Sequence, residues 1–243
     1  MADQSRTNTQ QQQGRTYPPG YGAIEPVSNY RPWDVDDEFR DVYELVRDHT
    51  MVDVYRLWTL WFVAKQVPGG DVLEVGSWRG GSGTVIARAL MSRHREAESS
   101  SSAPTVFLAD TFAGVVKAGT RDTYYKGGEH ANTSLDTVQE LLVRAGVDAV
   151  RLLAGIFPED RGHEIADRRF ALCHIDVDVY QSAKDTFEWA WPRMIPGGVV
   201  VFDDYGFYGC EGVTAYVEEL AQAGGLTVVP SLSGQAIVTR AVY

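Results

Sequence analysis

Short apolar runs alternate with stretches of helical periodicity through most of this 243-residue chain. Runs rich in Val, Ile, Leu and Phe predict strands, which we place at 71–75, 105–109, 150–154, 170–175 and 199–202. Between them, apolar positions recur every three or four residues, which predicts helices near 81–94, 133–145, 158–167 and 180–194. Near-continuous apolar strands interleaved with helices are typical of a parallel sheet covered on both faces. The pattern therefore predicts one α/β domain.

The two ends of the chain depart from this alternation. Residues 1–33 are rich in Gln, Pro and Tyr and cannot build a core, so we interpret them as a flexible N-terminal arm. Residues 34–243 form the predicted single domain. Helical spacing over 34–66 predicts two helices ahead of the sheet core, which begins at residue 70. The last predicted elements are a helix and a closing hairpin, at 211–223, 226–229 and 236–239.

Composition and charge exclude several classes of function. The formal net charge is −11, and nucleic-acid binding requires a basic face, so we expect no nucleic-acid partner. No apolar run reaches the roughly 18 residues that span a bilayer, and residues 1–15 lack the apolar core of a signal peptide. We therefore expect a cytoplasmic protein without a membrane partner. Cys173 and Cys210 lack metal-ligand spacing, which favours two unpaired thiols.

Two pairs of aspartates follow the fourth and fifth predicted strands. Asp176 and Asp178 come after the fourth strand, and Asp203 and Asp204 after the fifth. Four carboxylates in one partly dry cleft repel one another unless a cation neutralises them or some take up protons, and hard oxygen ligands suit magnesium, manganese or calcium. Helix or turn capping is the alternative. His174, deeper on the same strand, is predicted to be a buried structural histidine.

A glycine-rich turn follows the first strand of the sheet core. A phosphate-binding Walker loop requires a Lys after its last glycine, and none stands there. A dinucleotide fingerprint aligned on Gly76 requires glycine two residues later, where this chain has Trp78. The third scheme is a sequence pattern in which an acidic residue is followed by any one residue, a glycine, any three residues and a second glycine. Glu74, Gly76 and Gly80 match it, and it is the pattern of S-adenosylmethionine methyltransferases.

Asp110, at the end of the second strand, places a carboxylate where a ribose diol would lie. Such an acid fits either S-adenosylmethionine or NAD. Ligands of open parallel sheets bind outside the carboxyl ends of the strands, so we expect Glu74, Asp110 and the four aspartates to face one crevice. An NAD-dependent oxidoreductase and a non-catalytic metal-binding module remain alternatives to a methyltransferase.

The connection from 110 to 132 is long, and loops of that length are usually functional. We interpret it as a lid that faces the substrate. Its Lys117 and Arg121 would bind phosphates if the substrate were a nucleotide-linked sugar, with solvated surface charge as the alternative. His130 is a candidate base, because an imidazole titrates near neutral pH.

The chain resembles the macrocin O-methyltransferase family, which methylates deoxysugar hydroxyls on macrolide, aminocoumarin and related antibiotics. The segments that carry the resemblance are Glu-Val-Gly-Ser-Trp-Arg-Gly-Gly at 74–81, Asp-Thr-Phe-Ala-Gly at 110–114, Leu-Ala-Gly-Ile-Phe at 153–157, Asp-Val-Asp-Val-Tyr at 176–180, Pro-Gly-Gly at 196–198 and Asp-Asp-Tyr at 203–205. One departure is Val177, where family members usually carry glycine. Strand alternation predicts that Val177 points away from the site.

The resemblance implies a class I methyltransferase fold, with a mostly parallel seven-stranded sheet, an antiparallel last strand and helices on both faces. It also implies that Asp176, Asp203 and Asp204 hold Mg²⁺ or another divalent cation and that Asp178 is the general base. The candidate S-adenosyl-L-methionine contacts are Glu74, Gly76, Trp78, Gly80, Ser82, Asp110, Thr111, Gly155 and Asp176. The candidate contacts to a small-molecule sugar substrate are Lys117, Arg121, Tyr124, His130 and Tyr205. The aromatic arm favours a homo-oligomer.

Overall fold

The computed structural model describes residues 17–24, 27–96 and 104–242. The chain divides into two compact units, Met1–Arg31 and Pro32–Tyr243. The described part of the first unit contains a turn at residues 19 and 20 and neither helix nor strand. Residues 1–16 of the predicted arm lie outside the described residues, and the division into an arm and a domain at residue 33 stays a prediction.

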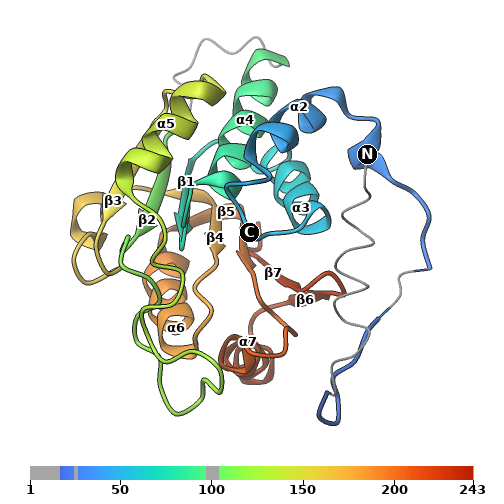
Figure 1. Cartoon of the computed structure of the whole chain (residues 1–243), viewed down its shortest axis with the longest axis vertical. Coiled ribbons are helices and arrows are strands. Elements are labelled where there is room, and N and C mark those ends of the chain that lie inside the picture. The colour runs from blue at the N-terminus through green and yellow to red at the C-terminus, as the bar shows by residue number, and fades with distance from the viewer. Residues whose placement is uncertain (1–16, 25–26, 97–103, 243) are drawn as a thin grey trace. The chain divides into compact units, whose positions relative to one another are not determined.

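The second unit is built around a seven-stranded sheet with the order β3-β2-β1-β4-β5-β7-β6 (Figure 1). The parallel strands are β1 (Asp71–Val75), β2 (Val106–Asp110), β3 (Val150–Ala154), β4 (Phe170–Ile175) and β5 (Met194–Phe202). A hairpin of β6 (Val228–Ser231) and β7 (Gln235–Thr239) completes the sheet, with β7 antiparallel to both β5 and β6. The predicted α/β sheet with an antiparallel last strand is confirmed.

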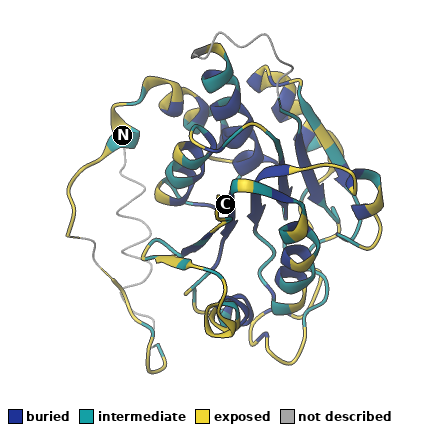
Figure 2. Ribbon diagram, turned by 180° about the vertical axis from the view of Figure 1, so that it is seen from behind, coloured by how far each residue is buried: buried dark blue, intermediate teal, exposed yellow. Residues whose placement is uncertain are grey.

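Helices cover both faces of this sheet. On one face lie α2 (Asp37–Val46), α3 (Val54–Ala64), α4 (Gly81–Glu96) and α5 (Leu135–Ala145), whose apolar side chains share one core cluster. On the other face, α6 (Tyr180–Ala190) and α7 (Glu211–Ala223) pack in a second cluster. The central strands of the sheet form the buried centre of the unit (Figure 2), and every residue of β4 is buried. This burial explains the unbroken apolar run of β4.

Local sequence signals set the helix boundaries that the periodicity predicted. The carboxylate of Asp36 accepts a hydrogen bond from the N–H of Phe39 at the start of α2, and Asp53 caps α3 in the same way. A short 3-10 helix, η1 (Pro32–Asp34), precedes them. Gly146 ends α5 in the left-handed conformation. The two predicted helices ahead of the sheet are confirmed.

Two of the predicted helices differ in the structure. The helix expected at 158–167 is only a 3-10 turn, η2 (Gly162–Ile165). Its first residues form a turn in which Asp160 accepts a hydrogen bond from the N–H of Ile156 at 2.8 Å, a local bond that competes with helix formation. The helix expected at 180–194 ends at Ala190 and passes into η3 (Trp191–Arg193), because Pro192 cannot donate the next helical hydrogen bond.

Candidate active site

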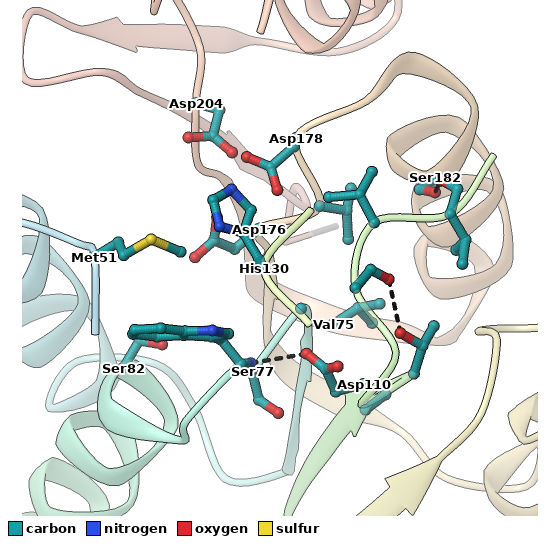
Figure 3. A pocket seen from close by; sticks show the side chains of 18 of the residues that line it. Met51, Val75, Ser77, Ser82, Asp110, His130, Asp176, Asp178, Ser182 and Asp204 are labelled. Atoms are coloured by element: carbon teal, nitrogen blue, oxygen red, sulfur yellow. Dashed lines mark hydrogen bonds between the residues drawn. The ribbon is translucent and has the colours of Figure 1, made fainter. Parts of the chain in front are cut away.

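A pocket lies at the carboxyl ends of β1, β2 and β4 and is also lined by the connection between β2 and α5 (Figure 3). The predicted cofactor residues that line it are Gly76, Trp78, Ser82, Asp110, Thr111, Gly155 and Asp176. Asp178, Asp204 and His130 line it as well. The predicted site residues outside its lining are Glu74, Gly80, Lys117, Arg121, Tyr124, Asp203 and Tyr205.

The turn after β1 approaches the loop after β4 closely. Gly76 has a φ of +95°, and a Cβ there would lie 1.6 Å from the carbonyl oxygen of Asp176. The N–H of Trp78 donates to Asp110 Oδ2 at 2.7 Å, and the φ of Trp78 is +47°. Gly80 instead faces α5, where its Cβ would meet Val138 at 2.7 Å. At position 76, only glycine allows the turn after β1 to lie so close to the backbone of Asp176.

Glu74 does not reach the pocket. Its side chain is completely buried, and its Oε1 lies 2.8 Å from Nδ1 of His174 on the neighbouring strand β4. A Cβ on Gly83 of α4 would lie 2.6 Å from Glu74 Oε2, so the carboxylate lies under that helix. The prediction that Glu74 faces the crevice is therefore wrong. The prediction that His174 is buried is confirmed.

Asp110 is the last residue of β2, and hydrogen bonds hold its carboxylate in place. Its Oδ2 accepts from Trp78, and its Oδ1 accepts from the N–H of Phe112 at 2.7 Å. Burial raises the pKa of Asp110, while these backbone N–H groups act in the opposite direction. The N–H of Gly155, after β3, donates to the carbonyl of Asp110 at 2.9 Å. Asp110 thus ties the turn after β1 to the loop after β2.

The two aspartate pairs meet because β4 and β5 are neighbours, with Ile175 opposite Phe202. In Figure 3 the carboxylates of Asp178 and Asp204 face one another, with Asp176 nearby. Both Asp178 and Asp204 have left-handed backbones, with φ of +64° and +65°.

The regular strand ends before these turns. Strand β4 ends at Ile175, and the left-handed residue Asp178 follows three residues later. Val177 therefore lines the pocket. Its side chain also packs against the core cluster on the α6 and α7 face, so the prediction that it points away from the site stays a prediction.

Mutual repulsion and burial perturb these carboxylates. Burial, with Asp203 and Asp204 adding to it, raises the pKa of Asp176 well above its usual range. Burial raises the pKa of Asp178 to about 6, and a hydrogen bond from Tyr125 opposes the rise. Burial and the charges of Asp178 and Asp203 raise the pKa of Asp204 to about 7. The site thus strongly favours added positive charge.

Asp203 lies behind the pocket and is held by two side chains that sequence reasoning missed. Arg56 Nη1 donates to Asp203 Oδ2 at 2.5 Å, and Gln235 Nε2 donates to Oδ1 at 2.7 Å. Although burial raises the pKa of Asp203, Arg56 and His174 bring it below the usual value. The only signal for Arg56 in the sequence is an arginine three residues after a helix-capping Asp53, within an otherwise apolar helix.

The donor set fits a divalent cation. His174, Asp176 and Asp203 each offer a ligand atom within 4.8 Å of the others, and so do Asp178, Asp204 and Cys210. Asp204 Oδ2 is buried and has no hydrogen-bond partner among the described residues. Carboxylate oxygens dominate the set, as magnesium and manganese prefer.

The connection after β2 is anchored to the rest of the domain by several side chains. Lys117 Nζ lies 2.5 Å from Glu159 Oε1 and 2.7 Å from Asp185 Oδ2. Arg121 pairs with Glu219, and its guanidinium lies 4.2 Å from the ring centroid of Tyr180.

The predicted substrate residues on this connection largely point elsewhere. Neither Lys117 nor Arg121 lines the pocket, so their predicted role as phosphate ligands is not supported by their placement. Tyr124 is 68% exposed. Tyr205, after β5, packs against a core cluster.

Three residues of the connection do organise the pocket. Asp122 is buried, and its Oδ1 and Oδ2 accept from the N–H groups of Tyr180 and Gly119 at 2.9 and 2.7 Å. Tyr125 lines the pocket, and its hydroxyl bonds to Asp178 and lies 3.3 Å from Nε2 of His130. Of the predicted substrate contacts, only His130 lines the pocket.

Comparison with known proteins identifies relatives over most of the chain. Residues 34–228 match the family model described as Macrocin-O-methyltransferase (TylF). The 8-demethyl-8-(2,3-dimethoxy-alpha-L-rhamnosyl)-tetracenomycin-C 4'-O-methyltransferase of Streptomyces olivaceus is 35% identical over 176 residues, which is 67% of this chain and 64% of that protein. The mycinamicin III 3''-O-methyltransferase of Micromonospora griseorubida is 34% identical over 69% of this chain and 70% of its own.

Among solved structures, the O-methyltransferase NovP is similar, with a TM-score of 0.65 and 25% identity over 80% of this chain and 83% of its own. Within the described residues, no helix is long and apolar enough to cross a membrane.

Proposed function

The chain belongs to the macrocin O-methyltransferase family, and on that premise we propose that it methylates a deoxysugar hydroxyl in the biosynthesis of an antibiotic or related secondary metabolite. S-adenosyl-L-methionine is the methyl donor and a divalent cation is the second cofactor in this proposal. The observation that carries it is one pocket in which Asp110 and the turn at Gly76 lie beside Asp176, Asp178 and Asp204. The family also favours this function over an NAD-dependent oxidoreductase or a metal-binding module.

The cofactor end of the pocket is formed by Gly76, Trp78, Ser82, Asp110 and Thr111. S-adenosyl-L-methionine, when bound, supplies an electrophilic methyl group. The carboxylate of Asp110 suits hydrogen bonding to a ribose diol. Its two backbone hydrogen bonds hold it in place. Gly76 lets the turn after β1 lie directly against the backbone of Asp176, because it carries no side chain there.

At the other end, Asp176, Asp203 and Asp204 are the proposed ligands of the divalent cation. Such a cation lowers the pKa of a hydroxyl that it coordinates, as it does for bound water. Asp178 is the proposed general base and accepts the hydroxyl proton on a carboxylate oxygen. The hydrogen bond from Tyr125 favours the ionised form of that carboxylate and opposes the rise in its pKa. His130 is the rival base, and it lines the same pocket.

The sugar substrate is proposed to be already attached to a natural product. Two curated relatives carry names that describe such glycosylated substrates. The placement of Lys117 and Arg121 agrees with this choice, because both are paired with carboxylates outside the pocket instead of facing a nucleotide phosphate.

The decisive test uses purified protein, methyl-labelled S-adenosyl-L-methionine and two acceptors, a glycosylated natural product and a nucleotide sugar. We expect label transfer to the first acceptor only. Excess EDTA should abolish it, and added Mg²⁺ or Mn²⁺ should restore it. Full activity in EDTA would exclude the cation, and transfer to the nucleotide sugar alone would overturn the choice of substrate.

Asp178→Asn tests the base. We expect turnover to fall at least ~100-fold with S-adenosylhomocysteine affinity unchanged, because a positioned base contributes about that much. Asp136→Asn, an exposed residue in the first turn of α5, is the matched control. Near-normal turnover of Asp178→Asn would transfer the role of general base to His130.

We also propose that the protein is a homo-oligomer. Analytical ultracentrifugation of the full chain measures its oligomeric state.

A further inference from the structure

Arg56 brings one positive charge into the aspartate cluster from α3. Its side chain is only 8% exposed. Nη1 donates to Asp203 Oδ2 at 2.5 Å and lies 3.7 Å from Asp204 Oδ1. Asp203 and Asp204 are also two of the three proposed cation ligands. The guanidinium therefore interacts with the same carboxylates that a divalent ion would use.

Partners outside the aspartate cluster hold this guanidinium in place. Arg56 Nε donates to Asp53 Oδ2 at 2.9 Å, and Nη2 donates to the carbonyl of Met51 at 3.3 Å. The guanidinium also lies over the ring of Phe207, 4.7 Å from its centroid. Asp53 is itself fixed, because it caps α3 by accepting from the N–H groups of Tyr55 and Arg56. A rigid helix end thus presents the positive charge to the aspartates.

Charge balance explains why such a residue is needed. Asp176, Asp203 and Asp204 are buried together, and ionised carboxylates in a dry site repel one another strongly. A buried guanidinium offsets part of this repulsion when no divalent ion is bound. The same charge repels an incoming divalent ion, and it already occupies a lone pair of Asp203. The guanidinium therefore stabilises the protein when no ion is bound and weakens the binding of the ion.

We propose that Arg56 is a resident counter-cation that substitutes for the divalent ion in the empty enzyme and lowers the affinity of the aspartates for that ion. This inference rests on the proposed cation site. Arg56 also lines the pocket, and its proposed role is to position Asp203. A modest affinity would leave the ion free to exchange as substrates and products come and go.

The test compares the full-length wild type with Arg56→Met and Arg56→Lys. Arg40→Met is the matched control, because Arg40 also pairs with an aspartate three residues before it near the start of a helix, Asp37 at 2.8 Å, but on the exposed surface. Mn²⁺ binding is measured from the electron paramagnetic resonance signal of the free ion. Thermal unfolding is followed by circular dichroism, once in EDTA and once in saturating Mn²⁺.

For Arg56→Met we expect Mn²⁺ to bind about tenfold or more tightly than to wild type, because a repelling charge is removed and Asp203 is released. The variant should melt lower than wild type in EDTA, and saturating Mn²⁺ should raise its Tm by more than it raises that of wild type. Arg56→Lys keeps the charge, so its Mn²⁺ affinity should stay within about threefold of wild type. Arg40→Met should match wild type in every measurement.

Three other results are informative, and two of them overturn the inference. Equal or weaker Mn²⁺ binding by Arg56→Met would do so while leaving the proposed cation site intact, provided that wild type binds Mn²⁺. Binding by Arg56→Met alone would support the inference and contradict the proposed cation dependence of the wild type. An Arg56→Met protein that is unfolded with Mn²⁺ as well as without it would show that the ion cannot replace Arg56.

Discussion

Replacing Gly76 with alanine perturbs the contact between the turn after β1 and the aspartate-bearing loop after β4. The φ of Gly76 is +95°, and the new Cβ would lie 1.6 Å from the carbonyl oxygen of Asp176. An L-residue in the left-handed region costs about 1–2 kcal/mol. The two chain segments must also separate by more than about 1 Å, because real Cβ contacts are not shorter than 3.0 Å. Overpacking of this kind costs about 1–3 kcal/mol more.

Gly225→Ala separates the two contributions. Gly225 has a φ of +79° and no neighbour within 4 Å of an added Cβ, so it reports the backbone cost alone. We expect Gly225→Ala to lose about 1–2 kcal/mol, and Gly76→Ala to lose about 2–5 kcal/mol, the sum of strain and overpacking.

Urea unfolding followed by circular dichroism measures both stabilities, and calorimetry with S-adenosylhomocysteine measures the cofactor site. We expect Gly76→Ala to lose most of its affinity, because the shifted loop displaces Asp176, whereas Gly225→Ala should bind as wild type does. If Gly76→Ala were no less stable than Gly225→Ala and bound the ligand normally, the close approach of the two segments would carry neither stability nor function.

Two further substitutions test the residues that tie the loops together. Asp110→Asn should weaken S-adenosylhomocysteine binding in calorimetry by about 10- to 100-fold, because charge-assisted hydrogen bonds are worth about 1.5–3 kcal/mol; unchanged affinity would remove Asp110 from the site. Asp122→Ala leaves the N–H groups of Tyr180 and Gly119 without their acceptor, so it should destabilise the protein by about 1–3 kcal/mol or more and speed proteolysis of the connection after β2. Cleavage at the wild-type rate would mean that other contacts hold the connection.

The alternation of apolar runs and helical spacing was enough to predict the succession of strands and helices along the chain. Buried parallel strands such as β4 carry a continuous apolar sequence, and this signal is local. The prediction failed at 158–167, because the hydrogen bond from Ile156 to Asp160 forms a turn that periodicity does not report.

Within the site, the sequence identified residues by type and position at strand ends, and Asp110, Asp176, Asp178 and Asp204 line one pocket. It could not distinguish an acid that faces the pocket from one that faces inward. Glu74 faces inward, because its position on β1 directs its side chain under α4 towards His174.

Local pattern alone therefore determined the elements, their order and the chemical character of the strand ends in this protein. Tertiary structure decided which charges meet. Arg56 and Asp203 are 147 residues apart in the chain and 2.5 Å apart in the fold, and Lys117 is paired with Asp185 outside the pocket. Such pairings depend on how helices dock on a sheet, and no spacing along the sequence encodes the distance between two side chains on different elements. The balance of charge at the site is consequently a property of the folded chain.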